Sequence, residues 1–450
     1  MKETKLFGTD GIRGQAMVEL TPKLAYNVGK TLAIMSKNKA ISKILVAGDT
    51  RLSTDCLKNA LISGILSHGC DVVDIGIVPT PVVSNLVQNS FTFGVMITAS
   101  HNPPEFNGLK IFNSSGNKLS KKEIKEFSYI YNNSSDYGLQ PFDKLGRLQI
   151  DDKLINNYIN QVFENINITL YPLKVAVDCS FGATSLLAKQ VLEKLGAKTT
   201  AFNCDYNGLN INCNCGALHP EFLQKTMSFD NDFDIAFAFD GDGDRIICVL
   251  RDGKVLDGDY ILYILARYLK MLNCLYGNKI VATILTNCGI EKTLKKYDIN
   301  LVRTAVGDSN VSFVLQKEKL ALGGEKAGHI IFNEFSKTGD GIYIACLLLK
   351  LQKLCGISIE KIASECEIYP YIEENITISN KIKDKLINLE CIKNTLEECL
   401  QMINDKGRIV LRPSGTEPKI RILVEGLNEQ LNKEIVAILK RKIIEASKLM

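Results

Sequence analysis

The sequence predicts an α/β protein built from three similar α/β domains with mixed sheets, followed by a smaller α+β domain at the C-terminus. Three observations lead to this fold class. A strand–loop–helix–strand pattern occurs three times before residue 366, and the pattern changes after it. The chain has 450 residues, which at roughly 150 residues per domain is enough for about three domains, or four if some are small. Hydrophobic residues make up 46% of the chain, enough to fill a core in each domain.

The three repeated units each begin with a short apolar strand and return to a second strand in under about 30 residues, as a right-handed βαβ unit does. The first strands are predicted at residues 44–47, 175–177 and 280–282, and the second strands at residues 68–73, 195–197 and 297–299. A loop and a helical stretch join the two strands of each unit. This repetition predicts three domains, each with a parallel or mixed sheet flanked by helices.

The last segment has a different order of elements. It starts with a strand at residues 371–378 and a helical stretch. A hairpin follows, with strands at residues 409–411 and 420–424, and a helix is expected from about residue 428. This order is typical of an α+β domain.

Polar stretches mark plausible connections between these parts. They lie near residues 132–146 and 366–370. We therefore expect domains at residues 1–152, 153–252, 253–365 and 366–450.

Charge and composition exclude several classes of function. The 54 Lys and Arg residues nearly balance the 50 Asp and Glu residues, so the net charge is +4 and nothing indicates a nucleic acid or an anionic membrane as partner. No apolar run approaches the roughly 18 residues of a membrane-spanning helix, and the run at residues 342–349 fits a core helix. The 14 cysteines are scattered without a Cys-x-x-Cys pair, as expected for free thiols in a reducing cytoplasm.

One group of cysteines resembles a metal site. Cys204, Cys213, Cys215 and His219 could together supply zinc ligands. A single residue separates Cys213 from Cys215, however, where zinc sites usually have about two to four. We therefore interpret this segment as a loop that contains small hydrophobic thiols.

Three aspartates alternate with glycines in a loop that is predicted to hold a metal ion. Asp240, Asp242 and Asp244 lie between two apolar runs, residues 234–239 and 246–250, that are typical of buried strands. Carboxylates at this density favour Mg²⁺, Ca²⁺ or Mn²⁺ over zinc. Three like charges this close repel one another unless a cation joins them, which argues against the alternative of a solvated acidic hairpin turn.

Two other interpretations of this loop fail on its sequence. A calcium EF-hand requires Gly at the sixth position and a bidentate Glu at the twelfth, where this chain has Arg245 and Arg251. A dinucleotide-binding fingerprint requires a further glycine where this chain has Ile246. The prediction is therefore a magnesium-type site.

A serine lies in a stiff polar loop after a predicted strand at residues 93–97. Residues 98–104 read Thr-Ala-Ser-His-Asn-Pro-Pro, and each proline fixes its own φ and restricts the residue before it. Ser100 lacks the flanking glycines of a nucleophile elbow, and a loop serine alone is usually a cap or turn residue. Together with a metal loop, its hydroxyl could carry a phosphoryl group, because phosphoryl transfer needs an acceptor and a cation that offsets charge.

Two further loops supply groups suited to a sugar phosphate. Residues 323–329 read Gly-Gly-Glu-Lys-Ala-Gly-His and nearly match a nucleotide P-loop, but His329 stands where the lysine should be. The loop instead offers the Glu325 carboxylate and the His329 imidazole for sugar hydroxyls and proton transfer. Residues 412–418 read Arg-Pro-Ser-Gly-Thr-Glu-Pro. Their arginine, hydroxyls and backbone N–H groups suit a phosphate nest, the alternative being an ordinary Ser-Gly hairpin.

Taken in order, the serine, metal, sugar and phosphate loops resemble the motifs of the α-D-phosphohexomutase superfamily. Residues 5–14, Lys-Leu-Phe-Gly-Thr-Asp-Gly-Ile-Arg-Gly, look most like those of bacterial phosphoglucosamine mutases. Further matching stretches are Asn-Gly-Leu-Lys at residues 107–110, His-Pro-Glu at residues 219–221 and Asp-Gly-Asp at residues 257–259. The resemblance covers essentially the whole chain. The sugar loop departs from the family pattern, because Lys326 and Ala327 replace the usual Gln and Ser.

This resemblance implies an intramolecular phosphotransferase, an isomerase that interconverts glucosamine 6-phosphate and glucosamine 1-phosphate and so feeds UDP-N-acetylglucosamine and cell-wall precursor synthesis. The active enzyme would carry a phosphate on Ser100 and form glucosamine 1,6-bisphosphate as a bound intermediate. One Mg²⁺ per active site would be held by Ser100, Asp240, Asp242 and Asp244. The protein would be cytoplasmic, would act on small sugar phosphates without nucleic acid or membrane, and would be a monomer or homodimer.

The resemblance also implies roles for individual residues. The catalytic group would comprise Ser100, His101, Arg13, Lys110, Arg245 and His329. Among these, Lys110 and His329 are the candidate proton carriers, and a lysine ringed by cations is expected to have a lowered pKa. The sugar and its non-reacting phosphate would be bound by Glu325, Lys326, Arg412, Ser414, Gly415 and Thr416.

Three rival functions stay open on the sequence. A phosphoglucomutase or phosphomannomutase of the same superfamily shares every catalytic part and differs only in its sugar contacts. A metal-dependent phosphatase would share the metal loop but would not need a site for a second, spectator phosphate. A sugar-phosphate sensor without enzymatic activity could lose the metal loop, yet all three aspartates are present.

Overall fold

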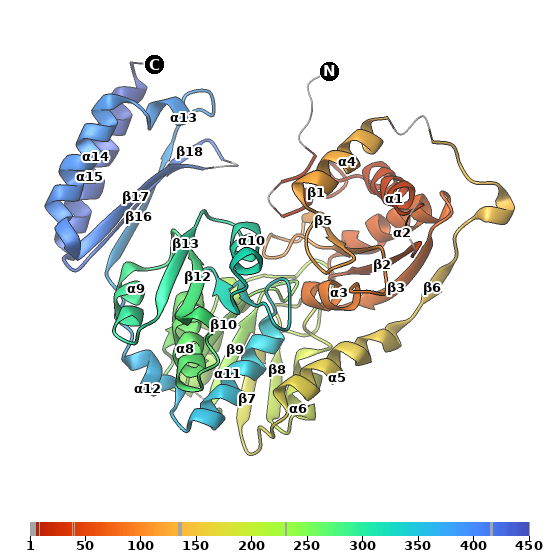
Figure 1. The fold of residues 1–450 in the computed structure, drawn as a ribbon, viewed down its shortest axis with the longest axis horizontal. Coiled ribbons are helices and arrows are strands. Elements are labelled where there is room, and N and C mark those ends of the chain that lie inside the picture. The colour runs from red at the N-terminus through yellow and green to blue at the C-terminus, as the bar shows by residue number, and fades with distance from the viewer. Residues whose placement is uncertain are drawn as a thin grey trace. The chain divides into compact units, whose positions relative to one another are not determined.

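A computed structural model of the chain describes residues 6–8, 10–37, 39, 41–133, 137–229, 232–414 and 417–449. Its strands form four sheets with helices packed around them (Figure 1). The predicted fold class is confirmed, because the first three sheets are mixed and the last is a small antiparallel sheet. The chain divides into two compact units, Met1–Thr283 with Val302–Ala363, and Ile284–Leu301 with Ser364–Met450.

The first sheet has six strands in the order β1-β5-β4-β2-β3-β6. Strands β2, β3, β4 and β6 pair in parallel, and β5 and β1 extend the sheet antiparallel. The strand bounds are β1 Ile12–Gln15, β2 Lys43–Gly48, β3 Asp71–Ile77, β4 Phe93–Ile97, β5 Phe106–Asn113 and β6 Leu148–Ile150. The predicted strand at residues 93–97 is confirmed as β4, and it is buried throughout, as a central strand flanked by helices should be.

The helices of this part are α1 (Pro22–Ser36), α2 (Leu52–Leu66), α3 (Thr80–Leu86) and α4 (Lys121–Asn132). Two glycines let α1 and α2 approach each other closely. A Cβ at Gly29 would lie 2.1 Å from Leu61 O, and a Cβ at Gly64 would lie 2.1 Å from Tyr26 O. Any larger side chain at either position would push the two helices apart.

The second sheet has five strands in the order β11-β10-β9-β7-β8. Its elements are α5 Ile155–Ile166, β7 Lys174–Asp178, α6 Ala188–Lys194, β8 Lys198–Phe202, α7 Glu221–Phe229, β9 Ile235–Phe239, β10 Ile246–Leu250 and β11 Val255–Leu256. Strands β9 and β10 pair antiparallel with Phe239 opposite Ile246. The aspartate cluster is therefore the loop of a hairpin between two buried strands, as the sequence predicts.

The second strand of each repeated unit begins three residues later than predicted. Strands β3 and β8 start at Asp71 and Lys198, and β13 (Asn300–Thr304) starts the corresponding segment of the third unit. In each unit a residue with positive φ comes first: Gly69 at 82°, Gly196 at 93° and Asp298 at 56°. These left-handed residues end the preceding helices, so the first three residues predicted as strand in each unit form the turn instead.

The third sheet has the order β13-β12-β14-β15. Its remaining elements are α8 Gly258–Met271, β12 Lys279–Thr283, α9 Cys288–Lys295, α10 Asp308–Glu318, β14 Leu322–Gly324, β15 Ile330–Phe332, α11 Gly341–Cys355 and α12 Ile359–Ser364. The apolar run at residues 342–349 lies in α11 and is buried, which confirms the predicted core helix. In the described part of the chain, no helix combines the length and the apolar character that crossing a membrane requires.

The second unit contains the C-terminal sheet, an antiparallel sheet in the order β16-β18-β17. Its elements are β16 Tyr371–Thr377, α13 Lys383–Leu386, α14 Glu390–Ile403, β17 Gly407–Pro413, β18 Lys419–Gly426 and α15 Glu429–Ser447. Helices α14 and α15 lie against this sheet (Figure 1). Their apolar side chains pack with those of the strands into one core. The predicted final helix is confirmed, and its N-cap Asn428 accepts hydrogen bonds from Gln430 N and Leu431 N.

Asp340, the N-cap of α11, is a buried acid whose ionisation opposes folding. It accepts hydrogen bonds from Tyr343 N at 3.0 Å and from the Tyr158 hydroxyl at 2.9 Å. Burial nevertheless raises the pKa of Asp340 from 3.8 to about 7. Between these two values the folded state binds more protons than the unfolded state, so this group's contribution to stability is present at low pH and is lost as the pH rises.

Asp340→Asn is expected to remove this pH dependence, because asparagine keeps the N-cap acceptor and has no proton to lose. Relative to the variant, the wild-type free energy of unfolding should fall by about 2–4 kcal/mol between about pH 4 and pH 7.5. Thermal unfolding across this range measures the effect. The exposed Asp143→Asn serves as the control, and parallel pH profiles for wild type and Asp340→Asn would show that Asp340 is not the titrating group.

Candidate active site

The serine loop is held in a strained and well-tethered conformation. Ser100 is 1% exposed and has a positive φ of 52°. Its backbone N–H donates to Thr98 Oγ1 at 2.9 Å, and its carbonyl accepts from Arg51 Nη2 and Asn212 Nδ2, both at 2.9 Å. The Arg51 guanidinium also donates to Asn102 O at 2.8 Å and is paired with buried Asp49. The stiffness predicted from the prolines is thus reinforced by an arginine that sequence reasoning missed.

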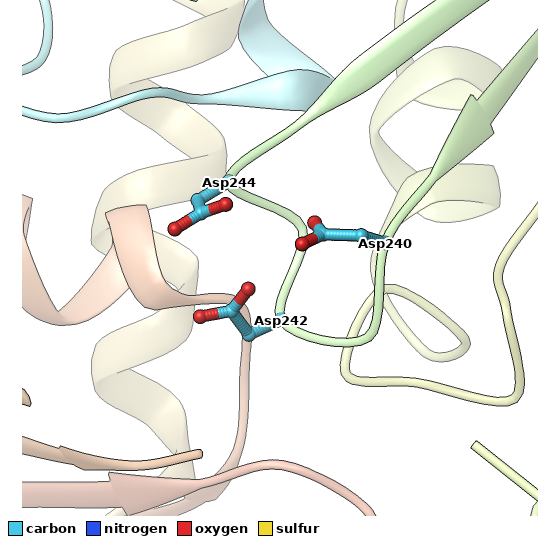
Figure 2. Close-up of side chains that lie close together, drawn as sticks. All are labelled: Asp240, Asp242 and Asp244. Carbon is cyan, nitrogen blue, oxygen red and sulfur yellow. The ribbon is translucent and has the colours of Figure 1, made fainter. Parts of the chain in front are cut away.

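The metal loop brings its three carboxylates together next to this serine. Oxygens of Asp240, Asp242 and Asp244 all lie within 4.8 Å of one another, and the side chains surround a common space (Figure 2). The Ser100 hydroxyl donates to Asp240 Oδ2 at 2.7 Å. Burial and the two neighbouring carboxylates raise the pKa of Asp240 to about 7. The sequence predicted this juxtaposition of a hydroxyl and three carboxylates across 140 residues.

The donor set fits a hard divalent cation. Asp242 Oδ1 is buried and has no hydrogen-bond partner, although a buried carboxylate oxygen without one is costly. Carboxylate and hydroxyl oxygens are the ligands that Mg²⁺ prefers. The residues that could hold such an ion are therefore Ser100, Asp240, Asp242 and Asp244.

Lys110 lies among carboxylates rather than among cations. Its Nζ is 2.7 Å from Asp242 Oδ2, 2.6 Å from Asp244 Oδ2 and 3.4 Å from Asp10 Oδ2. Burial lowers the pKa of Lys110, but these three carboxylates outweigh burial and raise the pKa well above its usual value. The expectation of a lowered lysine pKa is wrong, because the motif spacing did not show which charges would surround the ammonium group.

His329 is held between two aspartates. Its Nδ1 lies 3.5 Å from Asp244 Oδ1, and its Nε2 lies 3.6 Å from Asp308 Oδ2. Burial lowers the pKa of His329, and Asp244 and Asp308 reverse that effect so that the pKa is raised. Gly339 N–H donates to Nε2 at 3.0 Å, which assigns the neutral ring a proton on Nδ1, facing Asp244.

His101 has the opposite character. Its Nδ1 lies 3.3 Å from Ser100 Oγ. Burial lowers its pKa to about 3, and the positive charges of Arg245 and Arg13 add to that effect. The ring is therefore neutral at physiological pH, and its Nδ1 can form a hydrogen bond with the serine hydroxyl.

Both predicted arginines carry unused donors. Arg245 Nε is buried without a hydrogen-bond partner and lies 3.9 Å from Asp240 and 4.0 Å from Asp244. Arg13 pairs with Asp10 through Nη2, while its Nε is buried without a partner. Buried guanidinium donors without acceptors suit the oxygens of a phosphoryl group.

A second set of charges links this site to the third sheet. Lys118 pairs with both Asp10 and Asp308. Burial lowers the pKa of Lys118, but the two carboxylates outweigh burial, so the net shift of the pKa is upward. Sequence reasoning missed Lys118, Asp10 and Asp308, because no local pattern signals an ion pair between residues 190 positions apart.

The sugar loop lies between β14 and β15, close to the same charges. Glu325 Oε1 accepts from Gly307 N at 3.0 Å, and its charge acts on the Arg245 guanidinium. Lys326 is half-buried; its carbonyl accepts from Gly258 N at 2.9 Å. The Glu325 charge thus acts on Arg245 of the metal loop, whereas the Lys326 charge acts on Asp257.

The phosphate loop belongs to the second unit. Arg412 on β17 is directly opposite Arg421 on β18. Like charges in this position repel each other, and Arg421 is paired with Glu417. Burial and the Arg421 charge lower the pKa of Arg412. Arg421 Nε is buried without a hydrogen-bond partner, so Arg421 is a further anion-binding candidate that the sequence motif did not reveal.

The turn after Arg412 is partly described. Ser414 is 3% exposed, its N–H donates to Lys419 O at 2.8 Å, and its Oγ accepts from Glu417 N at 3.2 Å. Lys383 donates to the carbonyls of Ser414 and Glu417. The predicted residues Gly415 and Thr416 lie outside the described residues.

Four family models match the chain in order. They describe domains I, II and III and the C-terminal domain of phosphoglucomutase/phosphomannomutase, and they match residues 4–138, 156–253, 257–369 and 373–442. A phosphoglucosamine mutase of Dictyoglomus turgidum is 41% identical over 98% of both chains. A phosphoglucosamine mutase of Acetivibrio thermocellus is 40% identical over 98% of this chain and 99% of its own.

Solved structures agree in fold. A phosphoglucomutase/phosphomannomutase family protein of Burkholderia thailandensis matches with a TM-score of 0.82 at 23% identity, over 97% of both chains. An N-acetylphosphoglucosamine mutase of Aspergillus fumigatus, in complex with GlcNAc-6P and magnesium, matches with a TM-score of 0.71 at 17% identity, over 99% of this chain and 97% of its own. Because its relatives align along nearly their whole length, the chain belongs to the phosphoglucosamine mutase family, within the phosphoglucomutase/phosphomannomutase family.

Proposed function

We propose that the protein interconverts glucosamine 6-phosphate and glucosamine 1-phosphate through a phosphorylated Ser100 and a bound glucosamine 1,6-bisphosphate. One observation carries the proposal. The Ser100 hydroxyl is buried against Asp240 of a three-carboxylate cluster, while two guanidinium groups with unused donors belong to the same site. A hydroxyl, an oxygen-rich cation site and positive charge are the parts that phosphoryl transfer requires.

In the forward half-reaction, the bond from phosphorus to Ser100 Oγ breaks as a bond forms to the free sugar hydroxyl, which loses its proton. The second half-reaction returns the other phosphoryl group to Ser100 Oγ. Mg²⁺, bound by Ser100 and the three aspartates, would supply positive charge that offsets the charge on the transferring group. Arg13 and Arg245 would donate to the phosphoryl oxygens through their unused Nε groups.

Lys110 and His329 are the proposed proton carriers. Lys110 is one candidate, because its ammonium group lies beside Asp242 and Asp244 of the metal loop and its raised pKa keeps it protonated. His329 is the second candidate, because its imidazole lies between Asp244 and Asp308 and can hold and release a proton there. Glu325 would bind sugar hydroxyls, and Lys326 at the neighbouring position would contribute to the choice of hexose.

The phosphate loop would hold the phosphate that is not reacting. Arg412, Ser414, Gly415 and Thr416 were predicted for this role, and Arg421 joins them because it lies opposite Arg412 with its Nε buried and without a hydrogen-bond partner. The complexes of the Aspergillus fumigatus mutase with GlcNAc-6P and with glucose 1,6-bisphosphate support ligands of this class. The product would feed UDP-N-acetylglucosamine and cell-wall precursors in the cytoplasm.

Initial rates with glucosamine 6-phosphate, glucose 6-phosphate and mannose 6-phosphate test the proposal. The value of kcat/KM should be highest with glucosamine 6-phosphate. A higher value with glucose or mannose phosphate would favour the alternative, a phosphoglucomutase or phosphomannomutase of the same superfamily. Release of inorganic phosphate without isomerisation would instead indicate a phosphatase.

Arg412→Ala is expected to impair both directions of the reaction, since the loop is proposed to hold whichever phosphate is not reacting. Losing a charge-assisted contact to phosphate costs on the order of 1.5–3 kcal/mol, roughly ten- to a hundredfold in binding. KM values for the 6-phosphate and the 1-phosphate measure the effect. The exposed Arg441→Ala on α15 is the matched control, and a defect confined to one substrate would contradict the role.

A further inference from the structure

Each oxygen of Asp242 has a different environment. Oδ2 accepts hydrogen bonds from Thr80 Oγ1 at 2.5 Å and from Lys110 Nζ at 2.7 Å. Oδ1 is buried and has no hydrogen-bond partner. The protein therefore satisfies one oxygen of this carboxylate and leaves the other available to a ligand.

Thr80 contacts the metal loop through its backbone as well. It is fully buried at the start of α3, and its N–H donates to Asp242 O at 2.8 Å. The preceding Pro79 packs on Gly243, where an added Cβ would lie 3.0 Å from Pro79 Cβ. Thr80 thus fixes the backbone and the carboxylate of the same residue, across 162 positions of sequence.

The carboxylate of an aspartate is free to rotate unless something holds it, because its terminal torsion is broad and nearly two-fold. Lys110 alone does not define that rotation, since its Nζ is shared with Asp244 and Asp10. The short Thr80 side chain is fixed by its buried backbone and points its hydroxyl at one oxygen only. Partners of this kind orient metal ligands in general, and their loss commonly costs about 10- to 100-fold in metal affinity.

We propose that Thr80 is a positioning residue that acts through Asp242 and turns its Oδ1 toward the divalent cation; this rests on the metal site of the proposed function. Thr80 touches neither the sugar nor the transferring phosphoryl group in this role. Its hydroxyl sets the orientation of the central ligand, and its side-chain methyl is dispensable.

Direct metal binding tests the proposal, with Mn²⁺ as the probe and calorimetry on the dephosphorylated full-length chain as the readout. Thr80→Val keeps the shape and removes the hydroxyl, and it should weaken Mn²⁺ binding by about 10- to 100-fold. Thr80→Ser keeps the hydroxyl and should bind within about threefold of wild type. Thr80→Ala also lacks the hydroxyl and keeps the test available should the valine variant fail to fold.

Ser84→Ala is the matched control, because Ser84 lies one turn further along α3 and donates a buried hydrogen bond to Gly116 O at 2.7 Å, away from the metal loop. Its Mn²⁺ affinity should equal that of wild type. A second readout is turnover, which should recover in Thr80→Val at high Mg²⁺, as a purely structural defect would not.

The outcomes separate the two hypotheses. Absence of Mn²⁺ binding by wild type would overturn the metal site itself. Wild-type affinity in folded Thr80→Val or Thr80→Ala, with normal binding by wild type, would overturn the role of Thr80 alone. Equal weakening in Thr80→Ser and Thr80→Val would also overturn it, because packing of the methyl group and not the hydroxyl would then be responsible.

Discussion

Ser100→Ala is expected to lose mutase turnover almost completely, by on the order of 10⁴-fold or more, because the covalent carrier of the phosphoryl group is removed. The neighbouring Thr98 hydroxyl is bonded to Asp49 Oδ2 at 2.7 Å and Thr80 Oγ1 to Asp242 Oδ2, so both are engaged in other hydrogen bonds. The variant should stay folded, because the lost hydrogen bond to Asp240 is worth about 1–2 kcal/mol. Steady-state rates in both directions measure the loss, and unfolding by circular dichroism checks the fold.

The state of the serine supplies an independent measurement. Mass spectrometry of purified wild type should find a phosphate on Ser100 in at least part of the sample. The matched control is the exposed Ser115→Ala, which should keep both the phosphate and the activity. Near-normal turnover by Ser100→Ala, or a phosphate that persists in the variant at another residue together with activity, would contradict the assignment.

Much of the fold could be predicted because short-range patterns determine it. The apolar runs predicted at residues 234–239 and 246–250 became β9 and β10, the first beginning one residue later than predicted, since both strands are buried throughout and a turn joins them. The second strands of the repeats were placed three residues early, because the apolar residues just after each helix belong to a left-handed turn that hydrophobicity does not distinguish from a strand.

The sequence predicted those parts of the candidate site whose reacting groups lie together in one motif. It did not predict residues that act on a group far away in the sequence. The three aspartates and Ser100 are each visible in a local motif. Arg51, by contrast, lies some 50 residues before the loop that it tethers, and its role depends on tertiary packing alone. Thr80 is another example, because a threonine that follows a proline reads as an ordinary helix start.

The charge on Lys110 shows the same limit in electrostatics. A sequence motif names the ionisable groups but not their distances, and the direction of a pKa shift depends on which charges lie within a few ångströms. Lys110 was expected among cations and lies among Asp242, Asp244 and Asp10. The Lys110 charge therefore offsets the repulsion between Asp10 and the two metal-loop aspartates, Asp242 and Asp244.

Activity is expected to require a divalent cation and to disappear with a strong chelator, then return when Mg²⁺ is added. In Asp242→Asn a charged oxygen ligand becomes neutral, and Mg²⁺ affinity should fall by on the order of 100-fold, with kcat/KM at fixed low Mg²⁺ falling in parallel.

The variant should fold normally, since the asparagine oxygen can still accept hydrogen bonds from Thr80 and Lys110, which bond Asp242 in wild type. The control is Asp252→Asn, an exposed aspartate in the next turn of the same sheet that accepts from Lys254 N at 2.9 Å. Titration of activity with Mg²⁺ and calorimetric binding of Mn²⁺ should shift together for Asp242→Asn and stay unchanged for the control. Full activity after exhaustive chelation, or an unshifted Mg²⁺ dependence in Asp242→Asn, would contradict the metal site. The three aspartates would then only pair with the lysine and arginine side chains of the site.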